Sequence, residues 1–206
     1  MKAIIYTGLS VSFEEAKEIL NENVLYKAPI KRGDLIDDLD EKPDIIGIID
    51  GVFHQSPAVA HKEILHLINE GITVVGSSSM GALRASELDS LGMKGIGYVY
   101  EQYRDGEITS DDDVAVMLDM DTLEALSVPL VNMKYVFENA EKENIITKDE
   151  KEELMKIAKE LFYPKRNYTK VLKESTLDET RKNLLIDFIA SCKDIKKEDG
   201  KALIKY

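Results

Sequence analysis

Residues 72–88, ITVVGSSSMGALRASEL, run from a short apolar segment through a turn of small residues into a helical pattern. This order predicts a strand, a tight turn and a helix. Free backbone N–H groups and the helix dipole favour negative charge at the start of such a helix. The turn can therefore present a serine hydroxyl beside an oxyanion pocket, an arrangement that suits a nucleophilic serine.

The first 110 residues or so repeat this alternation of strand and helix. Ser12 with Glu15 predicts a capping box, and Ser56, Pro57 and Gly71 predict a capped helix start and stop. Strands are expected at 3–6, 24–26, 44–50, 72–75 and 95–100, and helices at 12–20, 34–39, 56–71 and from the serine turn to residue 92. The alternation predicts an α/β fold whose mostly parallel sheet is flanked by helices, with its chemistry at the carboxyl ends of the strands.

The strand patterns stop after about Asp111, and amphipathic helical patterns follow. Helices are expected at 111–126 (capped by Asp111, Asp112 and Asp113), at 129–140, at 151–162 after a Thr147–Glu150 capping box, and at 176–192 with a Thr176–Glu179 box. The expected core positions are Leu154, Ile157, Leu161, Leu185, Phe188 and Ile189. We predict an α/β core over residues 1–120 and a C-terminal helical region over residues 121–206, as a second domain or as an extension of the first.

The composition narrows the class of protein. The 206 residues carry 39 acidic and 27 basic side chains, a formal net charge of -12, which argues against nucleic acid as a partner. The single cysteine, Cys192, allows neither a disulfide framework nor a cysteine-based zinc site. No signal peptide precedes the first strand pattern, and no apolar run approaches the ~18 residues of a membrane span. A cytoplasmic protein without a membrane partner is expected.

Two predicted strand ends carry polar residues. One strand ends at Asp50, and the chain continues through Gly51 and Val52 to His54. The next strand leads directly into the serine turn. Neighbouring parallel strands would bring the two loops together. Lys62, expected on the second turn of the following helix, is the nearest plausible base, because a buried lysine loses its charge more easily. The alternative is a surface lysine.

Ser78 and Ser79 are the candidate nucleophiles, because three serines in a row exceed what a helix cap needs; the alternative is a serine-rich cap. The order Ser79-Met80-Gly81 resembles the serine environment of Clp-type and signal-peptide peptidases and favours Ser79 over Ser78. The Met80 N–H would then face the oxyanion, and Gly81 would allow close approach.

Other polar residues have weaker functional interpretations. His54 is a candidate substrate-binding or leaving-group residue, and Asp50 a candidate for orienting the loop. Arg84 and Glu87, three residues apart on one helix face, fit a site role or a surface ion pair equally well. The histidines His54, His61 and His66 do not have metal-ligand spacing. The glycines after residue 91 do not match a dinucleotide fingerprint, and no P-loop is present, so no cofactor is expected.

Several blocks together resemble the TfuA-like proteins. They are DGVFHQSPAVAHKEIL (50–65), GSSSMGALRASEL (76–88) and GMKGIGYVY (92–100), supported by TGLS (7–10), APIKRGDL (28–35), YRDGEI (103–108) and DDDVA (111–115). The resemblance covers about residues 1–135. Ser77 stands where an alanine is more familiar in the family, which argues against Ser77 as the nucleophile.

The resemblance implies a partner of a YcaO enzyme in peptide-backbone thioamidation. Such a protein would hydrolyse the C-terminal thiocarboxylate of a ThiS-like sulfur carrier with a serine–lysine pair, Ser79 and Lys62. Oxyanion donors would lie near Met80 and the Gly51–Val52 turn. In methanogenic archaea the target would be a glycine of the methyl-coenzyme M reductase α subunit; the alternative target is a ribosomal peptide. The competing functional classes are a non-catalytic adaptor for YcaO and a phosphate or nucleotide binder.

Overall fold

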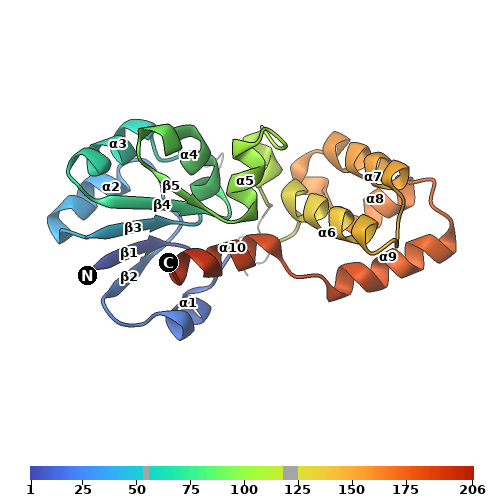
Figure 1. The fold of residues 1–206 in the computed structure, drawn as a ribbon, viewed down its shortest axis with the longest axis horizontal. Coiled ribbons are helices and arrows are strands. Elements are labelled where there is room, and N and C mark those ends of the chain that lie inside the picture. Colours follow the sequence, from blue (N-terminus) through green and yellow to red (C-terminus); the bar gives the residue numbers. More distant parts are fainter. Residues whose placement is uncertain (53–55, 118–124) are drawn as a thin grey trace. The chain divides into compact units, whose positions relative to one another are not determined.

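A five-stranded sheet forms the centre of the N-terminal part of the chain. The computed structural model describes residues 1–52, 56–117 and 125–206. The strands are β1 (Ala3–Tyr6), β2 (Val24–Lys27), β3 (Ile45–Ile48), β4 (Thr73–Ser77) and β5 (Lys94–Ile96). They lie in the order β2-β1-β3-β4-β5, and all neighbouring pairs are parallel (Figure 1). This confirms the predicted α/β class.

Helices cover both faces of this sheet. One face carries α2 (Asp34–Asp37), α3 (His61–Asn69) and α4 (Met80–Leu88), with short 3-10 helices η1 (Asp38–Glu41) and η2 (Asp89–Leu91) (Figure 1). The other face carries α1 (Phe13–Ile19) and α10 (Ile195–Ile204), while α5 (Tyr98–Arg104) follows β5. None of the helices in the described residues is long and apolar enough to cross a membrane.

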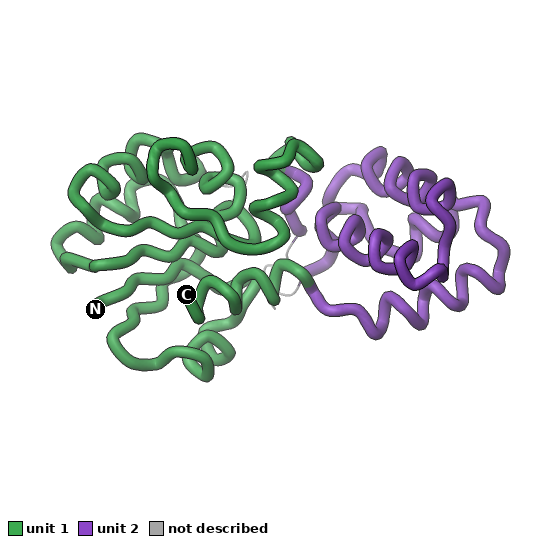
Figure 2. Tube along the Cα trace, in the orientation of Figure 1, with its two compact units in different colours: residues 1–111, 195–206 green, residues 112–194 purple. Residues whose placement is uncertain are grey.

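The chain divides into two compact units, coloured separately in Figure 2. One unit comprises residues 1–111 and 195–206, and the other comprises residues 112–194. Residues 195–206, which the sequence grouped with the helical region, belong to the first unit, where α10 (Ile195–Ile204) packs on the sheet. The physical reason is burial of Leu203 and Ile204 against Ile5, Val11 and Ile49 on one face of the sheet.

The second unit is helical and has its own core. Its elements are α6 (Leu130–Lys142), α7 (Lys148–Glu160), the 3-10 helix η4 (Tyr163–Lys165), α8 (Tyr168–Glu174) and α9 (Glu179–Ser191). The short 3-10 helix η3 (Asp111–Asp113) precedes them, and its last two residues also belong to this unit. Leu154 and Leu185 are buried in this core. Partly buried side chains packed against the core include the other expected positions, namely Ile157, Leu161, Phe188 and Ile189.

Two of the three predicted capping boxes are present. Ser12 with Glu15 caps α1, and Thr147 with Glu150 caps α7. The prediction of a Thr176–Glu179 capping box is wrong, because Asp178 is the N-cap of α9. Thr176 is held instead by the Glu153 carboxylate, which accepts from the Thr176 backbone N–H at 2.7 Å and from its hydroxyl at 2.9 Å.

The predicted helix over 56–71 begins later, at His61. Residues 57–60 are not helical, and the carbonyl groups of Pro57 and Val59 have partners in other parts of the chain. The Arg32 N–H donates to the Pro57 carbonyl oxygen at 3.0 Å, and the Arg84 Nε donates to the Val59 carbonyl oxygen at 3.1 Å. Lys62 therefore lies in the first turn of α3 and not in the second.

The predicted strand over 95–100 is also shorter. β5 ends at Ile96, Gly97 has a φ of 94°, and α5 begins at Tyr98. The Asp199 carboxylate accepts from the backbone N–H groups of Tyr98 and Val99 at 3.0 and 2.7 Å, which stabilises a helix start at this point.

The expected helix over 111–126 is wrong in its described parts. Only Asp111–Asp113 form a 3-10 helix, residues 114–117 are not helical, and residues 118–124 lie outside the described ranges. The Met117 N–H donates to the Ser127 hydroxyl at 2.8 Å, and the Leu126 N–H donates to the Met117 carbonyl oxygen at 2.8 Å. These bonds between distant residues replace a helical hydrogen-bond ladder.

Candidate functional site

The loops that follow β3 and β4 meet at the carboxyl edge of the sheet, as predicted. β3 and β4 are neighbours, with Ile48 opposite Gly76. The Ile49 carbonyl oxygen accepts from the backbone N–H of Ser79 at 3.3 Å and from that of Gly81 at 3.4 Å. The start of α4 is therefore tied directly to the end of β3.

Glycines make this close approach possible. A Cβ at Gly81 would lie 1.7 Å from the Ile48 carbonyl oxygen. A Cβ at Gly76 would lie 2.1 Å from the Gly81 carbonyl oxygen, and one at Gly51 would lie 2.7 Å from Met80 Cγ. Gly81 thus lets the start of α4 pack against the end of β3, and Gly51 makes room for the Met80 side chain.

The three serines of the turn have different environments. Ser77 is buried, and its hydroxyl shares its one proton between the carbonyl oxygens of Ile96 (2.8 Å) and Asp199 (2.9 Å). Ser78 is fully buried with a φ of 67°, and its Oγ has no hydrogen-bond partner in the described part of the chain. Ser79 is half-buried at the N-cap of α4 and makes no side-chain capping bond.

Ser78 is the residue that folding alone does not explain. A left-handed backbone costs a non-glycine residue roughly 1–2 kcal/mol. A buried hydroxyl without a partner costs about 1–3 kcal/mol more. Strained residues of this kind cluster at functional sites, and a nucleophilic serine on a sharp strand-to-helix turn is a known form of that strain. The sequence located the turn, but three adjacent serines carried no signal to show which one takes the left-handed position.

A pocket of about 450 Å³ opens beside this turn. Its walls come from the β3–α3 loop, from α4 and from the segment after α5. They are Val52, Ser56, Ala58, Met80, Leu83, Arg84, Glu87, Thr109, Ser110 and Asp111. The fold thus brings four predicted site residues together in one pocket: Val52, Met80, Arg84 and Glu87. Thr109 and Ser110 were missed, because no spacing in the sequence relates them to the serine turn.

Arg84 and Glu87 form the polar wall of the pocket. The Arg84 Nη1 contacts the Glu87 carboxylate at 2.6 Å, and the Arg84 Nε donates to the Val59 carbonyl oxygen at 3.1 Å. His61 Nε2 lies 2.8 Å from the same Glu87 carboxylate. The ion pair that was one of two interpretations is present, and Glu87 also links α4 to α3.

Asp50 holds a loop, as expected, but the loop is the one that follows β1. Its buried carboxylate accepts from the backbone N–H groups of Leu9 and Ser10 at 2.9 and 2.8 Å, and from the Ser10 hydroxyl at 2.6 Å. Asp50 therefore fixes the TGLS segment against the end of β3.

The N–H of Val52, one of the predicted oxyanion donors, is already engaged, and so is the N–H of Gly81, the residue after Met80. The Val52 N–H donates to the Ile30 carbonyl oxygen at 2.9 Å, because the loops after β2 and β3 pair through a short parallel bridge. The Gly81 N–H donates to Ile49, as described above. Val52 contributes to the pocket as a wall and not as a backbone donor.

The other candidates are not part of the pocket lining or are not described; Ser78 and Ser79 precede the lining residue Met80 but do not line the pocket themselves. Lys62 is exposed and does not belong to the pocket lining. His54 lies outside the described residues. Within the described ranges, no cluster of three or more histidine, cysteine, aspartate or glutamate side chains is suited to hold a metal ion.

The environment of Ser78 predicts an unusual effect on stability. Ser78→Ala removes the unpartnered hydroxyl and is expected to raise the free energy of unfolding by about 1 kcal/mol. Ser77→Ala removes a bonded hydroxyl and is expected to lower it by about 1 kcal/mol. Denaturant unfolding of both variants measures the two changes. A Ser78→Ala variant that is less stable than wild type would show that the Ser78 hydroxyl has a structural partner.

A family model matches the part of the chain that carries the pocket. The family model described as "TfuA-like protein" matches residues 50–167, which include the β3–α3 loop, the serine turn and all the residues that line the pocket. No curated protein matches the chain. The family suggests a role in thioamidation-related processes. Because the match covers more than half of the 206 residues, the chain belongs to the TfuA-like family.

Proposed function

We propose that this protein is the partner of a YcaO enzyme in peptide-backbone thioamidation and that it hydrolyses the thiocarboxylate of a ThiS-type carrier. The released sulfide would serve thioamidation of a glycine in the methyl-coenzyme M reductase α subunit. The observation that carries the proposal is Ser78, whose strained backbone and buried, unpartnered hydroxyl lie at the carboxyl edge of the sheet. These properties favour Ser78 over Ser79 as the nucleophile.

The proposed reaction has two steps. The Ser78 Oγ attacks the thiocarboxylate carbon and loses its proton, and the carbon–sulfur bond breaks to release hydrosulfide. The resulting ester with Ser78 is then hydrolysed by water, which regenerates the serine and leaves a carboxylate on the carrier. Because sulfide is a good leaving group, strong acid catalysis is not required; His54 is the candidate proton donor. The Met80 N–H is the candidate oxyanion donor.

Lys62 is the proposed base, and its exposure sets a condition on the mechanism. A lysine that acts as a base has to be uncharged, and the removal of water favours the uncharged amine. A bound carrier that covers Lys62 would remove water from the ammonium group and so favour the neutral amine. Hydrolysis would then depend on the carrier protein and not only on its reactive end.

Sulfide release tests the proposal directly. A ThiS-like carrier with a C-terminal thiocarboxylate is incubated with wild type, Ser78→Ala, Ser79→Ala and Lys62→Ala, and sulfide is measured over time. We expect release to fall at least ~100-fold for Ser78→Ala and for Lys62→Ala, and only a few-fold for Ser79→Ala. Lys205 is a second exposed lysine and provides the matched control, since Lys205→Ala should release sulfide like wild type.

The second candidate function is an adaptor that binds YcaO without catalysis. The exposure of Lys62, away from the pocket lining, favours it. An adaptor would release no sulfide, with or without YcaO, yet would increase thioamidation when sulfide is supplied to YcaO and its substrate. That result would replace the hydrolase proposal, whereas loss of release in Ser79→Ala alone would only move the nucleophile.

A further inference from the structure

Helix α10 contacts the loops that follow the first and third strands. A Cβ at Gly200 would lie 2.7 Å from the Val11 side chain and 3.2 Å from the Ile49 side chain. Val11 follows β1, and Ile49 follows β3 and accepts the hydrogen bonds of the serine turn. The glycine therefore lets α10 lie directly against Ile49, the residue whose carbonyl oxygen accepts the hydrogen bonds from the start of α4.

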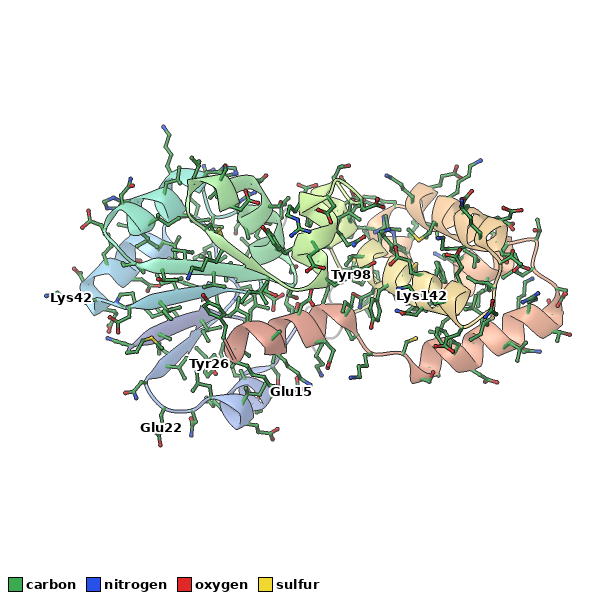
Figure 3. All side chains as sticks on the ribbon, in the orientation of Figure 1. Glu15, Glu22, Tyr26, Lys42, Tyr98 and Lys142 are labelled. Carbon is green, nitrogen blue, oxygen red and sulfur yellow. The ribbon has the colours of Figure 1, made fainter. Side chains whose placement is uncertain are left out.

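The preceding residue, Asp199, contacts the ends of the fourth and fifth strands. Its carbonyl oxygen accepts from the Ser77 hydroxyl at 2.9 Å. Its carboxylate accepts from the N–H groups of Tyr98 and Val99, and a Cβ at Gly97 would lie 2.3 Å from Asp199 Cγ. Tyr98 is labelled in Figure 3 beside α10. One short segment, Asp199–Gly200, thus contacts the end of β4 and the residues that follow β1, β3 and β5.

A second contact fixes the same helix on α1. Lys197 Nζ lies 2.6 Å from the carboxylate of Glu15, which is labelled on α1 in Figure 3, and this contact lowers the pKa of Glu15. The ion pair is partly exposed, so its contribution is small. Asp199 is the buried anchor of α10.

We infer that α10 is a positioning element of the serine turn and that Asp199 is the residue that locks it in place. Asp199 does not line the pocket; it acts through its contacts with α5 and Ser77, and through the packing of Gly200 against Ile49. This inference deepens the proposed function, and only its kinetic part rests on that function.

The cost of burying Asp199 supports a specific role. Desolvation raises the pKa of Asp199 to about 6, although the Val99 and Tyr98 N–H groups act in the opposite direction. A buried carboxylate of this kind opposes folding at neutral pH unless hydrogen bonds compensate for the hydration that it loses. Uncharged side chains cap helix starts with a smaller desolvation penalty, so the carboxylate is best explained by its two simultaneous backbone bonds.

Hydrogen exchange of the full chain tests the inference without any enzymatic activity. In Asp199→Ala we expect the amides of residues 76–83 and 98–104 to exchange about tenfold faster, while residues 148–160 of the helical unit keep their wild-type rates. Lys205→Ala, an exposed change on the end of the same chain segment, is the control. Faster exchange in residues 98–104 with unchanged exchange in residues 76–83 would overturn the inference, because Asp199 would then be only a cap of α5.

Two further variants keep the test decisive if Asp199→Ala does not fold. Asp199→Asn retains an oxygen that accepts one backbone bond and should restore most of the protection. Gly200→Ala forces a Cβ to 2.7 Å from Val11 and should loosen residues 76–83 while the Asp199 cap persists. Wild-type exchange in residues 76–83 of Gly200→Ala would contradict the role of α10.

The kinetic part uses the sulfide-release assay. In Asp199→Ala we expect kcat to fall about tenfold or more with KM within about twofold, since the turn is misplaced while the Arg84 and Glu87 wall of the pocket, outside residues 76–83, stays. Asp199→Asn should recover most of kcat. An unchanged kcat would overturn the inference. No release by wild type would reject the proposed function, and hydrogen exchange would still decide the role of α10.

Discussion

Gly81→Ala is expected to destabilise the protein by about 3 kcal/mol, the upper end of what overpacking costs. The added Cβ would lie 1.7 Å from the Ile48 carbonyl oxygen, so either β3 or the start of α4 must move. Both are backbone segments in the buried core, and neither can turn away as a side chain does. The effect is measured as the change in free energy of unfolding in denaturant.

The sign of this effect separates packing from helix propensity. Gly81 lies in the first turn of α4, where alanine is better than glycine by about 1 kcal/mol on propensity alone. Gly106→Ala is the control, because a Cβ there meets nothing within 4 Å and the positive φ of 74° costs about 1 kcal/mol. A Gly81→Ala variant as stable as wild type would show that α4 does not press on β3 as described.

Asp50→Ala is the second substitution with a large expected effect, and it should lower the free energy of unfolding by about 3 kcal/mol. The substitution removes three hydrogen bonds to a buried carboxylate, and the N–H groups of Leu9 and Ser10 lose this acceptor. The TGLS loop should then open, and thermal or denaturant unfolding should report the loss. Hydrogen exchange should show the loosening first in residues 7–12.

The matched control for Asp50 lies at the opposite end of the same strand. Asp44 precedes β3, is exposed, and accepts from the Lys2 N–H at 2.7 Å. Asp44→Ala should cost less than about 1 kcal/mol, since exposed charged contacts contribute little. Equal losses for Asp44→Ala and Asp50→Ala would mean that the Asp50 carboxylate is not the buried anchor of the TGLS loop.

Sequence patterns predicted the elements correctly where the stabilising interactions lie between residues close together in the chain. The run DIIGIID predicts a buried strand because every side chain is apolar between two acidic ends, and β3 lies there. The Ser12–Glu15 box works because both partners lie within one turn of each other. The alternation of such elements was enough to predict a parallel sheet and the meeting of its two polar loops.

Boundaries that depend on distant residues could not be predicted. The late start of α3 is set by bonds from Arg32 and Arg84, and the early end of β5 by Asp199, 100 or more residues away along the chain. Residues 111–126 have a helical pattern, but Met117 bonds to Ser127 and Leu126 instead. In each case a tertiary hydrogen bond outweighs a propensity of a few tenths of a kcal/mol.

The sequence by itself determined the α/β class, the serine turn and membership of the TfuA-like family, because these follow from local pattern and from long, specific blocks. Only the tertiary structure decided that Ser78 takes the left-handed position, that Arg84 and Glu87 share a pocket with Thr109 and Ser110, and that the last helix returns to the sheet. A backbone conformation among three equivalent serines, and contacts between segments far apart, depend on how the whole chain packs, which no window of sequence contains.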